Sequence, residues 1–229
     1  MDLQNDLNLN VTALRSVGDD ISVEITTQSG NNVCKECFVI SCSAYVELGI
    51  KKGECSTELY ESVAAESKTY AAFKRGAYIL GFGICSEKML VSKLLQKGFE
   101  REAAINAVAR LSEKGFLNNG QNAHREAEKC AAKLWGQSRI KAELFKKGYS
   151  SEDAESAIFS LEDAGLDFDE SCETLIDKKY PALPKERVEM QKLIASVCRY
   201  GYSIGQIKAA VSRISEKRRK DIFYGHKNL

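Results

Sequence analysis

The chain has 229 residues, and its apolar fraction of 44% is large enough for a folded core, which excludes a mainly disordered protein. Lys and Arg number 33 and Asp and Glu number 32, so the overall charge does not by itself indicate a polyanionic partner. The first ten residues contain two acidic side chains and no apolar stretch, and no segment reaches the roughly 18 apolar residues of a membrane helix. We therefore expect a cytoplasmic protein without a membrane contact.

Residues 1–64 are expected to form a small β-containing element. Residues 21–28 alternate apolar and polar side chains and are rich in β-branched types, and residues 33–41 resume an extended pattern. Residues 29–32, with the sequence SGNN, supply turn-forming side chains between them. Two extended segments joined by such a turn predict a β-hairpin.

The rest of the chain is expected to be helical. From about residue 45 to residue 214 the apolar residues recur at spacings of three and four, which is the period of an amphipathic helix. The chain has two prolines, Pro181 and Pro184, so long helices are permitted almost everywhere else. Most of the eight cysteines lie singly in this helical sequence, where we expect reduced, buried thiols.

The helical part contains an internal repeat. Gly98, Gly148 and Gly201 align at offsets of 50 and 53 residues, and the apolar residues around them keep the same phase. Between residues 92–116 and the window fifty residues later, eight of 25 positions are identical. The three copies therefore predict three structural units of the same kind.

Each shared glycine is predicted to end one helix just before the next begins. A glycine past a helix end adopts the left-handed conformation without a Cβ clash. Ser150 and Ser203 follow as N-caps, with Asp153 and Gln206 three residues later at the spacing of a capping box. Glu100 occupies the equivalent position of the first copy and is a poorer cap.

A repeat of about fifty residues has room for three helices. We therefore expect a mainly α protein with three tandem three-helix, helix-turn-helix-like repeats in an elongated curved array, preceded by the small β-hairpin element. The expected boundaries are residues 1–64 for the hairpin element, 65–118 for the first repeat and 119–168 for the second. Residues 169–229 form the third repeat, which ends in a basic tail.

Three segments resemble the RecX family of bacterial recombination regulators. Residues 133–158 resemble the central repeat of that family, and residues 85–119 and 193–211 resemble its first and third repeats. The central resemblance rests on Gly136, Arg139, Ile140, Glu143, Leu144, Lys147 and Gly148. The chain departs from the family pattern at Asn119, Asn122, Cys198 and Tyr200.

The resemblance implies a regulator without catalytic activity or a cofactor, which binds the filament of the RecA recombinase on DNA. Such regulators lie in the groove of the filament and modulate ATP hydrolysis and strand exchange, usually as inhibitors. The resemblance further implies a monomer that makes at most weak direct contact with DNA. An array of similar helical units suits this task because it can contact several subunits of a polymer.

Basic residues on the second and third repeats are the candidates for partner or DNA contacts. Arg125, Lys129 and Lys133 recur every four residues opposite the apolar face of one helix. The full set comprises Arg125, Lys129, Lys133, Arg139, Lys141, Lys146, Lys147, Lys217, Arg218, Arg219 and Lys220. Residues 148–177 follow with ten acidic residues and no Lys or Arg, so a basic and an acidic block are adjacent. The alternative is that both blocks are solvated helix faces, and that residues 217–220 complement a helix dipole.

An enzyme or a metal site is disfavoured. His124 and His226 are far apart in the chain, and Cys34 and Cys37 have zinc-ligand spacing without a second pair. No glycine-rich segment has the pattern of a phosphate-binding loop. Trp135, beside a glycine, is expected to pack at a helix junction rather than to form a stacking platform.

A helical-repeat protein that acts directly on DNA is the alternative function, because a helix, a glycine turn and a second helix also resemble helix-turn-helix modules. A recognition helix begins with Arg, Lys, Asn or Gln, which read base edges. The second helix of the middle repeat instead begins SSEDAESAI and is acidic. This sequence disfavours DNA as the primary target of that repeat.

Overall fold

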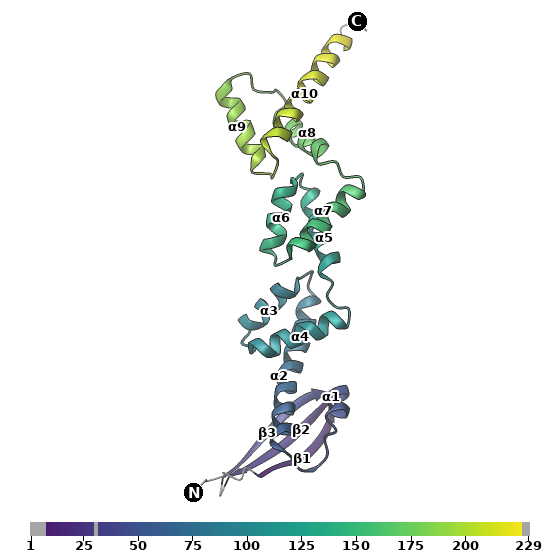
Figure 1. Cartoon of the computed structure of the whole chain (residues 1–229), viewed down its shortest axis with the longest axis vertical. Coiled ribbons are helices and arrows are strands. Elements are labelled where there is room, and N and C mark those ends of the chain that lie inside the picture. Colours follow the sequence, from purple (N-terminus) through teal and green to yellow (C-terminus); the bar gives the residue numbers. More distant parts are fainter. Residues whose placement is uncertain (1–7, 30–31, 226–229) are drawn as a thin grey trace. The chain divides into compact units, whose positions relative to one another are not determined.

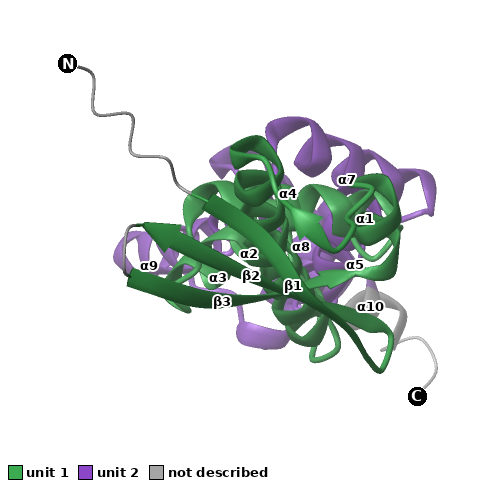
Figure 2. Cartoon of the chain, turned by 90° about the horizontal axis from the view of Figure 1, so that it is seen from below, with its two compact units in different colours: residues 1–117 green, residues 118–229 purple. Residues whose placement is uncertain are grey.

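The computed structural model describes residues 8–29 and 32–225, with side chains through residue 220. The chain divides into two compact units, Met1–Leu117 and Asn118–Leu229, which Figure 2 shows in different colours. Within the described residues there are ten helices and one four-stranded sheet, so the mainly helical fold is confirmed. None of the described helices combines the length and the apolar character that a membrane crossing requires.

The predicted hairpin is part of a larger sheet. The strands are β1 (Asn8–Val17), β2 (Asp20–Ser29), β3 (Asn32–Ser41) and β4 (Gly53–Glu54). They lie in the order β3-β2-β1-β4, and each pair is antiparallel. The β2–β3 pairing confirms the hairpin, although the centre of its turn lies outside the described residues. Strands β1 and β4, which extend the hairpin into a four-stranded sheet, were not predicted from the sequence.

The sheet buries one face against a long helix (Figure 1). Alternate residues Val23 and Ile25 of β2 and Ile40 of β3 are fully buried, together with Val63 of α2 (Thr57–Leu80). A short helix, α1 (Cys42–Glu47), covers another part of the same core. Along β2 the buried Val23 and Ile25 alternate with partly buried residues, which is the period of two that predicted this strand.

Helix α2 also belongs to the helical part of the first unit. It packs on α4 (Arg101–Glu113), and α3 (Glu87–Gln96) completes a core that includes the fully buried Leu90, Leu94 and Leu111. The Arg110 guanidinium donates two hydrogen bonds to the carboxylate of Glu66, the first of 2.6 Å from Nη1 to Oε1. Glu66 is 9% exposed, so this ion pair ties α2 to α4 in a partly desolvated position.

The second unit contains six helices with two apolar cores. The helices are α5 (Asn119–Ala131), α6 (Gln137–Lys146), α7 (Ser151–Asp163), α8 (Phe168–Lys179), α9 (Arg187–Cys198) and α10 (Ile204–Gly225). The first core lies among α5, α6 and α7 and includes Ile140 and Leu144, together with Phe168 from the start of α8. The second lies among α8, α9 and α10 and includes Ile176, Leu193 and Ile207.

The three repeated corners have the predicted backbone conformation. Gly98, Gly148 and Gly201 have φ angles of +88°, +87° and +95°, which lie in the left-handed region that favours glycine. At the first two corners the residue after the glycine donates its N–H to the carbonyl five residues earlier, from Phe99 to Leu94 and from Tyr149 to Leu144. These bonds satisfy carbonyl groups that the helix end would leave without a partner.

The helix caps that follow these corners are also confirmed. Ser150 Oγ accepts from the Asp153 N–H at 3.0 Å, and the Asp153 carboxylate accepts from the Ser150 N–H at 3.0 Å. Ser203 and Gln206 form the same reciprocal pair, at 3.2 Å and 3.1 Å. Glu100 makes no side-chain cap bond, as its residue type predicts.

Candidate partner-binding surface

Two of the predicted contact lysines are held by a buried carboxylate. Glu126 of α5 is 8% exposed, and its carboxylate accepts from Lys129 Nζ at 2.9 Å and from Lys147 Nζ. Burial alone raises the pKa of Glu126, but the two ammonium groups outweigh that effect and hold the pKa below its ordinary value of 4.5. Lys147 therefore joins the end of α6 to α5, whereas Lys129 pairs within α5. With the same buried carboxylate as partner, both lysines are poor candidates for a partner contact.

The other cations on these two helices differ in their surroundings. Lys141 lies 3.9 Å from the carboxylate of Glu155 on α7, a distance at which a surface ion pair contributes little. Arg125 and Lys146 are exposed, and no carboxylate among the described residues pairs with either. Three of the predicted contact cations thus face acidic residues of the same unit, namely Lys129, Lys141 and Lys147.

Arg139 lies at the centre of a series of alternating cations and aromatic rings. Its guanidinium carbon is 3.9 Å from the ring centroid of Trp135 and 5.2 Å from that of Tyr200. Lys133 Nζ lies over Trp135 at 5.2 Å, and Lys179 Nζ lies over Tyr200 at 4.3 Å. These five residues form what we call the cation–aromatic ladder, in which each ring carries two cations. Such contacts stabilise by about 0.5–1 kcal/mol each at exposed sites.

Backbone contacts hold the ladder in place. The Gly136 N–H donates to the Tyr200 carbonyl oxygen at 2.7 Å, and the Tyr202 hydroxyl donates to the Leu134 carbonyl oxygen at 3.1 Å. Leu134 has a φ of +57°, a conformation that costs a residue with a branched side chain about 1 kcal/mol or more. The contacts with the α9–α10 turn compensate this strain, so the α5–α6 corner is fixed by the next repeat.

The Arg139 guanidinium is oriented by this corner as well as by the rings. Its Nη1 donates to the carbonyl oxygen of Arg199 at 3.0 Å, which leaves its other N–H groups for an external acceptor. Within the described part of the chain, none of Lys133, Arg139 and Lys179 forms an ion pair with a carboxylate. The ladder therefore carries three positive charges that pack against aromatic rings and not against acidic side chains.

The basic C-terminal cluster is divided between internal and exposed positions. Arg218 pairs with Asp177 of α8 and donates to the Tyr180 carbonyl oxygen at 3.1 Å. Lys217, Arg219 and Lys220 are exposed along α10. Arg218 therefore joins α10 to α8, while the other three cations of the cluster are open to solvent.

A second arginine of α10 faces the same acidic helix. Arg213 contacts Glu173 and, at 3.9 Å, Asp169. The sequence pattern did not single out Arg213, because its acidic partners lie about forty residues earlier. Part of the acidic block is consequently neutralised within the unit.

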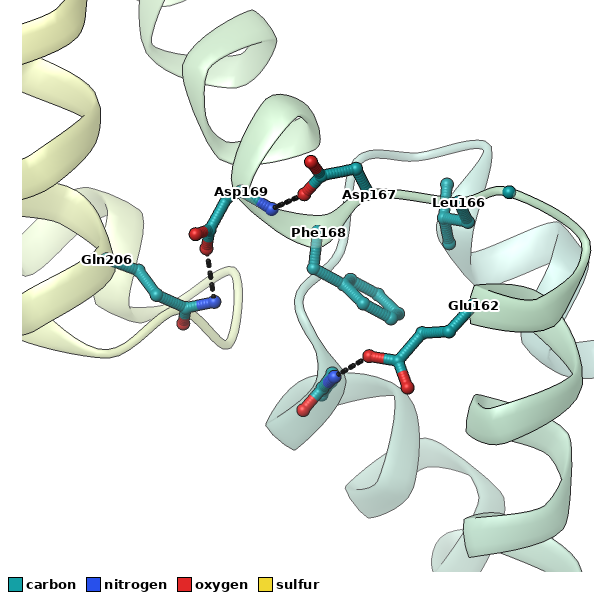
Figure 3. A pocket seen from close by; sticks show the side chains of 8 residues that line it. Glu162, Leu166, Asp167, Phe168, Asp169 and Gln206 are labelled. Atoms are coloured by element: carbon teal, nitrogen blue, oxygen red, sulfur yellow. Dashed lines mark hydrogen bonds between the residues drawn. The ribbon is translucent and has the colours of Figure 1, made fainter.

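Three acidic residues of the block, Glu162, Asp167 and Asp169, line a shallow groove of about 470 Å³ (Figure 3). Asp167 caps α8 by accepting the Asp169 and Glu170 N–H groups, and Gln206 of α10 donates to Asp169 at 2.9 Å. Glu162 accepts from Gln137 of α6. These internal bonds occupy the carboxylates, and no group of three potential metal ligands exists among the residues that the structure describes.

The histidine and cysteine candidates do not form a reactive group. His124 Nε2 lies 3.4 Å from Glu128, and His226 lies outside the described residues. Cys34 and Cys37 are free and exposed on β3. Burial raises the pKa of the Cys172 thiol to about 12, as expected for an inert thiol in an apolar core.

Of the five ladder residues, Lys133 and Arg139 were predicted from the sequence as contact residues, and the other three were missed. Trp135 packs against the first core of the second unit, as predicted for a junction residue, but its ring also carries two cations. Lys179, at the end of α8, and Tyr200, in the α9–α10 turn, were not candidates, because they lie some forty to sixty-five residues from Trp135. Tyr200 was visible in the sequence as a departure from the family pattern immediately before a corner glycine.

Comparisons with known proteins support the resemblance. No family model matches the chain. The regulatory protein RecX of Xanthomonas axonopodis pv. citri (strain 306) is 30% identical over 126 residues, which cover 55% of this chain and 76% of that protein. The chain belongs to the RecX family. The regulatory protein RecX of Caldanaerobacter subterraneus subsp. tengcongensis is 27% identical over 176 residues, 76% of this chain and 87% of that protein.

Solved structures carry the same fold. A crystal structure of regulatory protein RecX aligns with a TM-score of 0.67 and 17% identity, over 88% of this chain and 99% of the other. A crystal structure of RecX from Lactobacillus salivarius aligns with a TM-score of 0.56 and 18% identity, over 65% of this chain and 97% of the other. The helical repeats and the ladder thus lie in a RecX fold.

Proposed function

We propose that this RecX-family protein binds the RecA–DNA filament and inhibits ATP hydrolysis and strand exchange by RecA. Membership of a family of regulatory proteins is the observation that supports this proposal. The regulator acts by binding, in the cytoplasm, as a monomer, and without a chemical step of its own. The helical units contact successive protomers of the filament, so that binding is the sum of several modest contacts.

The surface chemistry agrees with a protein partner better than with DNA as the primary target. The first turn of α7 carries Glu152 and Asp153, which would repel phosphates at the position where a recognition helix begins. The cations of the second unit are interspersed with carboxylates, as expected for a surface that meets another mixed-charge surface. The exposed Lys217, Arg219 and Lys220 are the residues we assign to any weak direct contact with DNA.

The test is the rate of ATP hydrolysis by RecA on single-stranded DNA, measured over a range of molar ratios of this protein. We expect the rate to fall at sub-stoichiometric amounts, because one regulator contacts several protomers. An unchanged rate at every ratio would reject the proposal. A parallel titration with DNA alone over salt concentration separates direct DNA binding, whose affinity falls steeply with salt.

A further inference from the structure

The cation–aromatic ladder is built as a binding element rather than as a stabilising contact alone. Its three cations lack a carboxylate partner among the described residues, whereas Lys129, Lys147 and Arg218 each have one. A planar guanidinium held against two rings has little freedom left to lose, so a bound anion would order it at low entropic cost. The remaining N–H groups of Arg139 suit a planar acceptor, such as a carboxylate, that can accept two parallel hydrogen bonds.

We propose that the cation–aromatic ladder binds a carboxylate-rich segment of a protein partner, with the Arg139 guanidinium as its central donor. Lys133 and Lys179, at the two ends, would each meet a further carboxylate of the same segment. The exposed Arg199, whose carbonyl oxygen accepts from Arg139, adds positive charge next to the ladder. This inference deepens the proposed function. It rests on that proposal for the identity of the partner, which would be part of the recombinase filament.

Two observations favour a protein segment over single-stranded nucleic acid at this site. Each ring already has two cations over it, so a base that stacked on Trp135 or Tyr200 would compete with these cations. The acidic residues 148–177 belong to the same unit and oppose a long polyanion more than a short segment with a few carboxylates. The groups of the ladder that a partner can reach are therefore the N–H donors of Arg139 rather than a free aromatic face.

The test measures binding of a fluorescent peptide of alternating Glu and Gly residues to the full chain by anisotropy. The comparison probes are the same peptide with Gln in place of Glu, and an oligothymidylate. The ladder variant carries Lys133→Glu and Lys179→Glu, and its matched control carries Lys192→Glu and Lys208→Glu. All four lysines are exposed in the second unit, and both variants change the net charge equally, so non-specific electrostatics affects them alike.

We expect the Glu peptide to bind the wild type and the control variant, and the ladder variant to bind it about tenfold more weakly or worse. Arg139→Lys, which keeps the charge but loses the planar fork, should also weaken binding. The Gln peptide should not bind. If the ladder and control variants lost affinity for the Glu peptide equally, the proposal would be overturned. It would also be overturned if the ladder variant lost affinity for the oligothymidylate alone.

These outcomes separate the inference from the proposed function, because peptide binding is measured without RecA. If the ladder variant still inhibits RecA as the wild type does and binds the Glu peptide normally, the inference falls and the proposed function stands. If the wild type binds the peptide through the ladder but leaves RecA unaffected, the proposed function falls and the ladder remains a carboxylate-binding site. Circular dichroism of both double variants should show unchanged helix content, because all four side chains are exposed.

Discussion

Gly136 and Gly201 approach each other so closely that neither has room for a β-carbon. A Cβ on Gly136 would lie 2.5 Å from the Gly201 carbonyl oxygen, and a Cβ on Gly201 would lie 2.5 Å from the Arg139 amide nitrogen. The contact joins the α5–α6 corner to the α9–α10 turn, in the same place as the hydrogen bond from Gly136 to Tyr200. The two glycines therefore determine how the ladder is assembled.

Replacing the first of these glycines tests the contact directly. Gly136→Ala should destabilise the protein by about 1–3 kcal/mol, because the added methyl group overlaps backbone atoms that cannot move independently. Gly136 has an ordinary φ of −78°. The loss of stability in the alanine variant therefore measures the close contact with Gly201 and not backbone strain. Urea denaturation followed by circular dichroism measures the change.

A matched control lies nearby in α10. Gly205 has open space around its Cα, with the nearest atom, Ser203 Oγ, 3.8 Å from an added Cβ. Gly205→Ala should leave stability unchanged or raise it by about 0.5–1 kcal/mol, since alanine is the better helix former. If both alanine variants had the same stability, the close contact would not constrain the corner.

The buried carboxylate of Glu126 should make stability depend on pH. Its pKa is lower in the folded protein than its ordinary value of 4.5, so its contribution is complete above that value and is lost as the pH falls through the folded pKa. Glu126→Gln should cost about 1–3 kcal/mol at neutral pH, because two partly exposed ammonium groups lose their partner. Denaturation at pH 7 and at about pH 3 measures the difference between the wild type and the variant.

That difference should shrink at the lower pH, where the wild-type carboxylate becomes protonated. Glu128→Gln is the control, because Glu128 is an exposed residue of the same helix whose carboxylate lies 3.4 Å from His124. A difference that remained constant with pH would mean that the charge of Glu126 does not matter to stability.

Local patterns predicted the corners correctly because the physics of a helix end is local. Gly148 and Ser150 lie within a few residues of the groups that they satisfy, so spacing alone was sufficient. Strand β1 was missed because its sequence, NLNVTALRSV, places Leu9 and Val11 among asparagines. Its identity as a strand depends on pairing with β2, which the alternation in β1 alone does not reveal.

The candidate surface was predicted less well because charge counts ignore internal partners. Lys129 and Lys147 looked free in the sequence, but both donate to Glu126. Glu126 lies on the buried face of α5, three residues after Ala123 and four before Cys130. That spacing was a usable signal for an internal ion pair. The contact of Arg139 with Tyr200 joins residues in different repeats and has no period along the chain, so only the tertiary structure reveals it.

The contact between α2 and the sheet should respond to alkaline pH. The Tyr70 hydroxyl donates to Asp20, and burial together with that bond raises the pKa of Tyr70 to about 12. The folded state thus holds this proton more tightly than the unfolded state, so the stabilisation is complete below about pH 10 and is lost as the pH rises toward 12. Ultraviolet absorbance of tyrosinate during a pH titration measures the ionisation.

Tyr70→Phe should remove one late-titrating phenol from that titration and cost about 1 kcal/mol at neutral pH. Lys74 still donates to Asp20 at 2.6 Å in the variant, so the carboxylate keeps a partner. Tyr78→Phe is the control, because Tyr78 is 58% exposed near the C-terminal end of α2. A Tyr70 variant whose titration matched that of the wild type would contradict the assignment.

The unequal caps of the repeats predict opposite effects of single substitutions. Ser150→Ala removes the side-chain acceptor of the α7 capping box and should cost about 1 kcal/mol. Glu100→Ser supplies the acceptor that α4 lacks and should stabilise the protein by about 0.5–1 kcal/mol, although it also removes the exposed ion pair with Lys68. Thermal denaturation measures both shifts, and Ser151→Ala controls for loss of a hydroxyl without a cap bond. A lower midpoint for Glu100→Ser would show that the ion pair matters more than the cap.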